Sequence, residues 1–181
     1  MTFPSVTFRT PRLTAAALSY SSSSQTLNAV STQLAAILTP DVTRHLPPDI
    51  QTVRDKESAA NWLSSILNEC QFVAVSLVDH DALAGFFLLY PEAIEQESQG
   101  DGYLLRLGYV VAERYQGQGL ASEMIAGLVA WCRASGVVTA LSGGASAENA
   151  PSIKVLEKNG FVREENDENH QGDTVFLTLT I

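Results

Sequence analysis

The apolar residues of segment 105–136 follow two different periods in succession. Residues 105–111 form a short run rich in β-forming side chains, which predicts a strand. From Leu120 to Cys132 the apolar residues recur at helical spacing, which predicts an amphipathic helix. Gly136 follows this stripe at a position where helices commonly end. We therefore expect a strand, a short loop and a long helix in this segment.

Hydrophobic patterning in the rest of the chain predicts further strands and helices. Pro11 marks the first strand as bent or at an edge, and Pro40 closes the first helix, which four serines precede. Residues 79–81 form a tight hairpin turn, and residues 43–53 form an ordered loop. The order predicts an α/β fold in which helices pack on the faces of a mixed sheet. The expected strands are 6–15, 72–78, 83–89, 137–141, 161–165 and 174–181, and the expected helices are 27–38, 58–67 and 149–160.

Two glycines, Gly117 and Gly119, punctuate the loop before the long helix. Because glycine lacks a Cβ, the chain can adopt positive φ there and approach a ligand closely. The free N–H groups and the positive end of the helix then face the ligand, which is usually a phosphate. The loop has neither the lysine of a Walker loop nor the third glycine of the dinucleotide fingerprint. We predict an anion cradle of another kind, with a simple strand-to-helix turn as the alternative.

Three segments resemble the GCN5-related N-acetyltransferase (GNAT) family. Residues 116–121, Gln-x-x-Gly-x-Ala, resemble the Gln/Arg-x-x-Gly-x-Gly/Ala signature of that family. Residues 149–161 resemble its Asn-x-x-Ser/Ala helix, which ends in Gly-Phe. Residues 10–13, Thr-Pro-Arg-Leu, resemble the opening strand of the ribosomal-protein N-terminal (RimJ/RimL-like) branch. The resemblance extends over nearly the whole chain and is weak between residues 15 and 70.

This resemblance implies a GNAT-like α/β fold with a mixed, mostly antiparallel central sheet flanked by helices, in a single acetyltransferase domain over residues 1–181. It implies direct transfer of an acetyl group from the co-substrate acetyl-CoA to a primary amine in a ternary complex, without a metal. Ser152 would be the catalytic donor near the thiol. The residues implied to bind acetyl-CoA come from the strand, the loop and the later helix: Tyr109, Val110, Val111, Gln116, Gly117, Gln118, Gly119, Leu120, Ala121, Asn149 and Ser152.

Several of these residues have a structural alternative, and the chain departs from the family in two places. Asn149 is a good helix N-cap, Ser152 suits a first helical turn, and a strand tyrosine such as Tyr109 packs readily in a core. Many relatives have a proton-donating tyrosine where this chain has Leu156, and residues 141–145 offer no carboxylate base. A non-catalytic acyl-CoA-binding or sensor domain is therefore the first alternative function. An interaction protein whose glycine loop is only a turn is the second.

Charge and composition narrow the range of partners. A formal net charge of −9 and a pI near 4.7 argue against nucleic acid and favour a cationic partner such as an amine. The two cysteines and three histidines lack the spacing of a metal site, so we assign no metal. No apolar run approaches the roughly 20 residues of a membrane helix, and no secretion signal is evident, so we expect a cytoplasmic protein. The sequence does not decide whether the protein forms a homodimer, how long the acyl group is or which amine is the acceptor.

Acidic side chains are concentrated in residues 91–101, between two predicted strands. In the family this connection borders the acceptor groove, where acidic groups would attract a protonated small-molecule amine or protein N-terminus. A solvated loop is the alternative, because charge runs usually face water. The general base could be Glu92, Glu95, Glu97 or a water chain, and the sequence does not choose among them.

Overall fold

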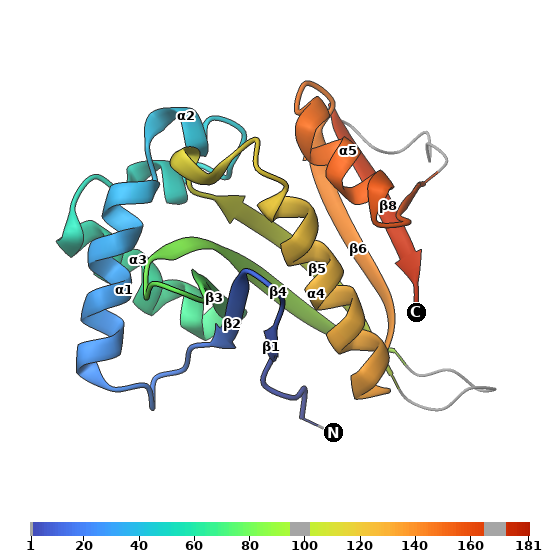
Figure 1. Ribbon diagram of the computed structural model, residues 1–181, viewed down its shortest axis with the longest axis horizontal. Helices are drawn as coiled ribbons and strands as arrows, with labels where there is room; N and C mark the ends of the chain where they lie inside the picture. Colours follow the sequence, from blue (N-terminus) through green and yellow to red (C-terminus); the bar gives the residue numbers. More distant parts are fainter. Residues whose placement is uncertain (1, 95–101, 165–172) are drawn as a thin grey trace.

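A single sheet forms the centre of the protein, whose computed structural model describes residues 2–94, 102–164 and 173–181 (Figure 1). The strand order is β1-β2-β3-β4-β5-β6-β8-β7. Pairing is antiparallel throughout except between β5 and β6, which are parallel, so the predicted mixed, mostly antiparallel sheet is confirmed. The strands are β1 (Thr7–Arg9), β2 (Leu13–Ala17), β3 (Gln71–Leu77), β4 (Leu83–Ile94), β5 (Gly102–Val111), β6 (Val138–Ser146), β7 (Val162–Arg163) and β8 (Thr174–Thr180).

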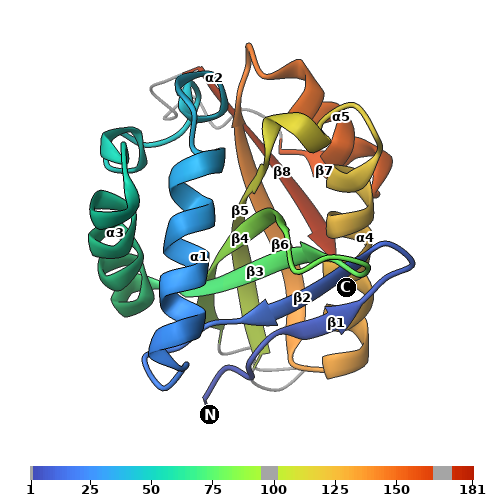
Figure 2. The same cartoon turned by 60° about the vertical axis from the view of Figure 1, so that its left-hand side comes forward.

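Helices cover both faces of the sheet (Figure 2). Helices α1 (Ser24–Ile37) and α3 (Lys56–Glu69) pack on one face, where Leu34 and Trp62 join a core that includes Phe72 and Phe86. Helices α4 (Leu120–Ser135) and α5 (Ala150–Lys158) pack on the other face, in the core that contains Phe87. The short elements are α2 (Pro40–Thr43) and the 3-10 turns η1 (Ile50–Thr52) and η2 (Glu113–Tyr115). No helix among the described residues is long and apolar enough to cross a membrane.

The helix ends carry the local signals that the sequence indicated. Ser23 caps α1 by accepting a hydrogen bond from the backbone N–H of Thr26, so the serine run does begin a helix. Gly136 ends α4 in the left-handed conformation, with φ 65°. Gly160 follows α5 with φ 89°, again where an L side chain would be strained. The long helices therefore begin and end close to the predicted positions.

Two predictions near prolines were wrong. Residues 6–15 are not one strand, because the chain turns at residues 10–12 and returns as β2, antiparallel to β1. The expected edge position is confirmed for β1, which ends the strand order. Pro11 has no N–H for a sheet ladder, and the backbone N–H of Thr10 donates to the carbonyl of Leu13 across the turn. Pro40 does not simply close the first helix, which already ends at Ile37. It opens α2, at a position where a proline lacks no helical hydrogen bond.

Strand β6 is longer than predicted because two glycines extend it. The hydrophobic pattern indicated a strand over residues 137–141, whereas β6 continues to Ser146. A Cβ at Gly143 would lie 3.2 Å from Cδ1 of Leu156, and a Cβ at Gly144 would lie 3.0 Å from Cε1 of Phe176. The missing side chains thus allow α5 and β8 to pack closely against this strand.

We expect Gly85→Ala to lower the free energy of unfolding by about 1–3 kcal/mol, as overpacking of a filled site does. A Cβ at Gly85 on β4 would lie 2.1 Å from the backbone carbonyl oxygen of Val110 on β5, so the two strands would have to separate. Urea denaturation measures the loss. Gly108→Ala is the control, because a Cβ there meets nothing within 4 Å. Equal stability of Gly85→Ala and wild type would show that the strands are less tightly paired than described.

Candidate active site

The central parallel strands β5 and β6 separate before either ends. Their pairing runs from Tyr103↔Val138 to Leu107↔Gly143, although β5 continues to Val111 and β6 to Ser146. Figure 1 shows the two strands diverging toward this end. Beyond Leu107, β5 pairs among the described residues with β4 alone. The backbone of residues 108–111 therefore presents one edge that no other described strand covers.

A cavity of about 820 Å³ opens at this uncovered edge. Tyr109 and Val110 both line it, although the side chain of Tyr109 packs on the α4 and α5 side of the sheet and that of Val110 on the α1 and α3 side. Successive strand residues point to opposite faces, so a cavity that touches both lies at the strand edge. From the other wall, residues 143–146 of β6 and Asn149, Ser152 and Leu156 of α5 complete this end of the cavity.

The loop between β5 and α4 has the backbone geometry of an anion cradle. Gly117 and Gly119 have φ of 71° and 77°, and Gly119 is the N-cap residue of α4. A Cβ at Gly117 would meet nothing within 4 Å, so this glycine serves the backbone conformation and leaves open space beside the loop. The first N–H groups of α4, which begins at Leu120 and Ala121, follow directly. These features fit a phosphate group.

The side chains of the two loop glutamines bond locally. Gln116 donates from Nε2 to the carbonyl oxygen of Val111 at 3.0 Å, and Gln118 donates from Nε2 to the carbonyl oxygen of Arg114 at 3.0 Å. Both side chains thus stabilise the turn after β5. The part of residues 116–119 that remains for a ligand is chiefly the backbone.

Helix α5 brings a serine hydroxyl to the cavity wall. Asn149 caps the helix through Oδ1, which accepts a hydrogen bond from the backbone N–H of Ser152 at 3.3 Å. The capping alternative for Asn149 is therefore confirmed for its side-chain oxygen. The hydroxyl oxygen of Ser152 lies 2.8 Å from the phenol oxygen of Tyr109. Residues on β5 and α5 that were predicted from separate motifs thus meet at one point.

The Tyr109 phenol has one hydrogen to donate, and the hydroxyl oxygen of Ser152 is a better acceptor for it than the Ser152 carbonyl oxygen. The backbone carbonyl oxygen of Ser152 is 3.5 Å from the phenol, at the limit of a hydrogen bond, whereas Oγ is 2.8 Å away. Burial raises the pKa of Tyr109 although the Ser152 hydrogen bond lowers it, so the phenol stays protonated at neutral pH. With the phenol donating to Oγ, the hydrogen of Ser152 is free to be donated elsewhere.

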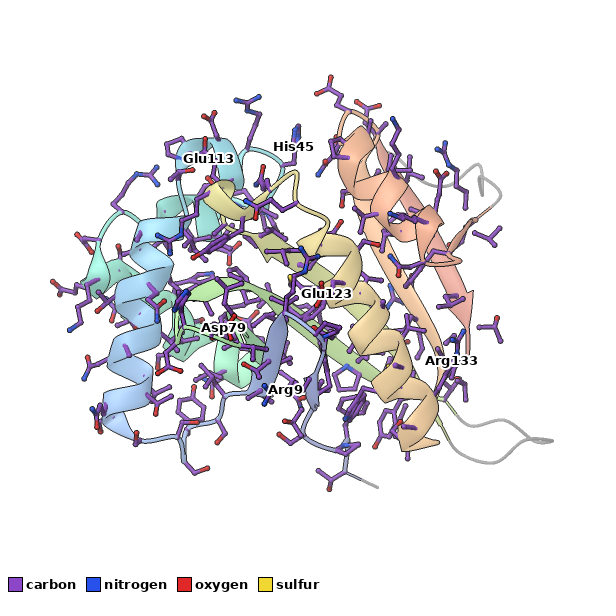
Figure 3. The ribbon with its side chains drawn as sticks, viewed as in Figure 1. Arg9, His45, Asp79, Glu113, Glu123 and Arg133 are labelled. Carbon is purple, nitrogen blue, oxygen red and sulfur yellow. The ribbon has the colours of Figure 1, made fainter. Side chains whose placement is uncertain are left out.

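The opposite end of the cavity is lined by residues that the sequence motifs did not indicate. Trp62 and Phe86 provide an aromatic wall, and Nε1 of Trp62 donates to Oδ2 of Asp49 at 3.0 Å. Glu69 at the end of α3 and His45, labelled in Figure 3, also line the cavity. The helical stripe of α3 indicated Trp62 as a core residue, but no spacing in the sequence joins it to Asp49. Only the folded arrangement brings this set together.

The candidate general bases have different positions. Glu92 forms an ion pair with Arg106, with Oε2 2.9 Å from Nε, and both side chains are more than half exposed. Arg106 also lines the cavity. Glu95 and Glu97, with most of the acidic segment 91–101, lie outside the described residues. Glu92 is therefore the described candidate, and its charge is already matched by an arginine.

Neither cysteines nor metal ligands form a reactive centre in the described ranges. Burial raises the pKa of Cys132 to about 12, so its thiol stays protonated. Cys70 is half-buried, and burial raises its pKa too. Between residues 2 and 181, without segments 95–101 and 165–172, no group of three or more His, Cys, Asp or Glu side chains could hold a metal ion.

Comparison with known proteins gives one family match. The family model described as an acetyltransferase (GNAT) domain matches residues 26–162. No curated protein matches the chain. The matched segment contains the loop, the N-cap of α5 and Ser152.

Several solved structures share the fold at low sequence identity. An acetyltransferase of the GNAT family from Bacillus anthracis superposes with a TM-score of 0.71 at 17% identity, over 97% of this chain and 98% of that chain. RimL, a ribosomal L7/L12 alpha-N-protein acetyltransferase in complex with coenzyme A, has a TM-score of 0.72 at 18% identity, over 95% and 96%. The ribosomal-protein-S5-alanine acetyltransferase from Vibrio fischeri has a TM-score of 0.68 at 14% identity, over 97% and 96%.

Proposed function

This chain belongs to the acetyltransferase (GNAT) domain family, and from that premise we propose that it is an acetyl-CoA-dependent N-acetyltransferase. Residues 1–181 would act as one catalytic domain that transfers acetyl directly to a primary amine in a ternary complex. One observation carries the proposal: the uncovered edge of β5 and Ser152 line one cavity, and the glycine loop lies between the end of this strand and the start of α4. In this arrangement the anion cradle, the strand edge and the proton donor would face the diphosphate, the amide-containing arm and the thioester of acetyl-CoA in turn.

The residues proposed to hold acetyl-CoA form two groups. The uncovered edge of β5 at Tyr109, Val110 and Val111 presents backbone groups with which an extended amide-containing chain can pair, apart from the Val111 carbonyl, which already accepts from Gln116. The backbone of residues 116–121 would bind the diphosphate through amide N–H groups and the positive end of α4. Asn149 would lie beside the thioester arm, with Oδ1 engaged in capping α5. Acetyl-CoA supplies the activated acyl group and a thiol leaving group.

Ser152 is the residue proposed to donate a hydrogen bond to the leaving thiol. When its Oγ accepts from the Tyr109 phenol, 2.8 Å away, the hydrogen of Ser152 points away from that bond. A fixed donor placed where negative charge develops lowers the barrier of an acyl transfer. Leu156, which replaces the usual tyrosine, is buried in the core and has no proton to give. Ser152 and Tyr109 thus provide hydroxyl groups in the cavity that Leu156 also lines.

The acceptor is proposed to enter from the end of the cavity beneath α2 and α3. Asp49 and Glu69 favour a protonated amine there, and Trp62 provides apolar surface for its carbon chain. Before it can attack, the ammonium must lose a proton to water or to a carboxylate. Both a protein N-terminus and a small-molecule amine meet these requirements. The names of the ribosomal-protein acetyltransferases with this fold favour testing protein N-termini first.

Calorimetric titration of the purified chain with acetyl-CoA tests the proposal. We expect saturable binding with one site per chain, followed by release of free thiol when peptide N-termini or amines are added. The thiol is measured with a chromogenic disulfide. Binding without turnover on any amine would favour the acyl-CoA sensor, which the leucine at position 156 motivates. Absence of binding by folded protein would refute the proposed function.

A further inference from the structure

The turn between β1 and β2 is joined to the first turn of α4 by a set of short polar contacts. Oε1 of Glu123 accepts from the hydroxyl of Thr10 at 2.6 Å and from the backbone N–H of Arg12 at 2.9 Å. Oε2 of Glu123 accepts from Nε of Arg12 at 2.6 Å. Nη1 of Arg12 donates to the carbonyl oxygen of Gln118 in the glycine loop at 2.9 Å. Two nitrogens of the Arg12 guanidinium are therefore held by acceptors, Nε by Glu123 and Nη1 by Gln118.

The third nitrogen of this guanidinium lies beside the glycine loop. Nη2 of Arg12 is 3.6 Å from the point where a Cβ of residue 119 would stand. Within the part of the chain that the structure describes, Nη2 donates to no acceptor. The Arg12 side chain is 48% exposed, so a ligand in the loop can reach it. A fixed planar cation thus presents free N–H groups at the rim of the cradle.

The charge of Glu123 explains why a cation is needed at this position. Glu123 is acidic and stands in the first turn of α4, next to the groups that would bind an anion. Burial raises its pKa, but the hydrogen bonds from Thr10 and Arg12 and the charge of Arg12 outweigh burial and hold the pKa below its ordinary value. A carboxylate that is ionised at neutral pH would repel phosphate there. Arg12 neutralises it and adds donors of its own.

We infer that Arg12 is a further ligand-binding residue of the cradle, whose Nη2 donates to the diphosphate of the coenzyme while Glu123 and the Gln118 carbonyl hold the guanidinium in place. The inference rests on the proposed function, because it assigns a residue to the same site. Arg12 comes from the β1–β2 turn, 106 positions before Gln118 of the loop that it completes. The rim of the cradle is therefore built from two distant segments.

The test compares Arg12→Gln with wild type on three probes. We expect Arg12→Gln to bind coenzyme A and dephospho-coenzyme A about tenfold more weakly, as loss of one charged hydrogen bond predicts. Binding of pantetheine, which has no phosphate, should stay within about twofold. Calorimetry measures the two nucleotides, and ligand-observed NMR measures pantetheine. A loss of affinity for coenzyme A alone would place Arg12 at the 3′-phosphate, which dephospho-coenzyme A lacks. An equal loss for pantetheine would show that Arg12 only maintains the shape of the site. Either result overturns the assignment.

Two further variants separate binding from folding. Arg133→Gln removes the same charge from the last turn of α4, at the other end of the helix from Glu123 (Figure 3), and should bind every probe as wild type does. Arg12→Lys keeps the charge but replaces the fork with one ammonium, so it should lose part of the affinity for the diphosphate and keep its melting temperature. Wild-type affinity of Arg12→Lys would overturn the role of Nη2. Failure of wild type to bind coenzyme A would instead refute the proposed function.

Discussion

Gly119→Trp is expected to abolish binding of acetyl-CoA, with a loss of at least about a hundredfold in affinity. Residue 119 is the N-cap residue of α4 and faces the open side of the cradle, where Nη2 of Arg12 also lies. An indole there would fill the space beside the amide groups and displace the guanidinium. Two or more charged hydrogen bonds to phosphate would be lost, each contributing about 1.5–3 kcal/mol. Calorimetric titration with acetyl-CoA measures the result.

Gly136→Trp is the matched control for this substitution. Gly136 ends the same helix with φ 65°, close to the 77° of Gly119, and a Cβ there meets nothing within 4 Å. Both variants therefore carry the strain of an L residue in the left-handed region, about 1–2 kcal/mol. We expect both variants to lose stability, with acetyl-CoA binding lost only at position 119. Wild-type affinity of Gly119→Trp would show that the coenzyme binds away from the loop.

Ser152→Ala is expected to slow acetyl transfer by about a hundredfold, as removal of a positioned proton donor does. The dissociation constant of acetyl-CoA should stay within about twofold, because the backbone N–H of Ser152 still donates to Asn149 and keeps the start of α5 in place. Steady-state kinetics with a fixed acceptor, together with calorimetry, separates kcat from binding. Loss of binding equal to that of Gly119→Trp would show that Ser152 supports the structure rather than the reaction.

Tyr109→Phe tests how Ser152 is oriented. Removing the phenol hydroxyl leaves the ring in the core and releases the 2.8 Å hydrogen bond to Oγ. We expect a smaller loss of kcat than for Ser152→Ala, since the serine hydrogen is still present but no longer directed. If the two groups act as a unit, the double variant should be no slower than Ser152→Ala alone. Additive losses would show that Tyr109 acts independently of Ser152.

Local signals in the sequence explain most of the fold. The helical stripe of α4, the serine cap of α1 and the hairpin of β3 and β4 were each indicated by residues within one segment. The turn at Pro11 was missed because a proline inside a strand-like pattern fits both an edge strand and a turn. The extension of β6 through Gly143 was missed because it depends on pairing with β8, a strand that comes much later in the chain.

The candidate site was predictable where a motif is contiguous. The glycine loop and the helix capped by Asn149 were each predicted from consecutive residues. Tyr109 of β5 and Ser152 of α5 come into contact where β5 and β6 separate. The point of separation depends on how the two strands pair, and neither segment predicts it alone. The acceptor end, with Asp49 and Trp62, has no motif because its chemistry is assembled from a loop and a helix face. The motifs therefore indicated residues that we propose for the coenzyme, and none of those that we propose for the acceptor.

The bond between Arg12 and Glu123 also bears on the order in which the protein folds. Its partners are 111 positions apart in the chain, so it forms only after a very long loop has closed. The turn that carries Arg12 belongs to an edge hairpin of the sheet, whereas Glu123 belongs to a helix on one face. A partly folded chain would hold the glycine loop next to an unneutralised carboxylate. Coenzyme would then favour the state in which the β1–β2 turn has docked on α4, and its binding would report that this long-range contact has formed.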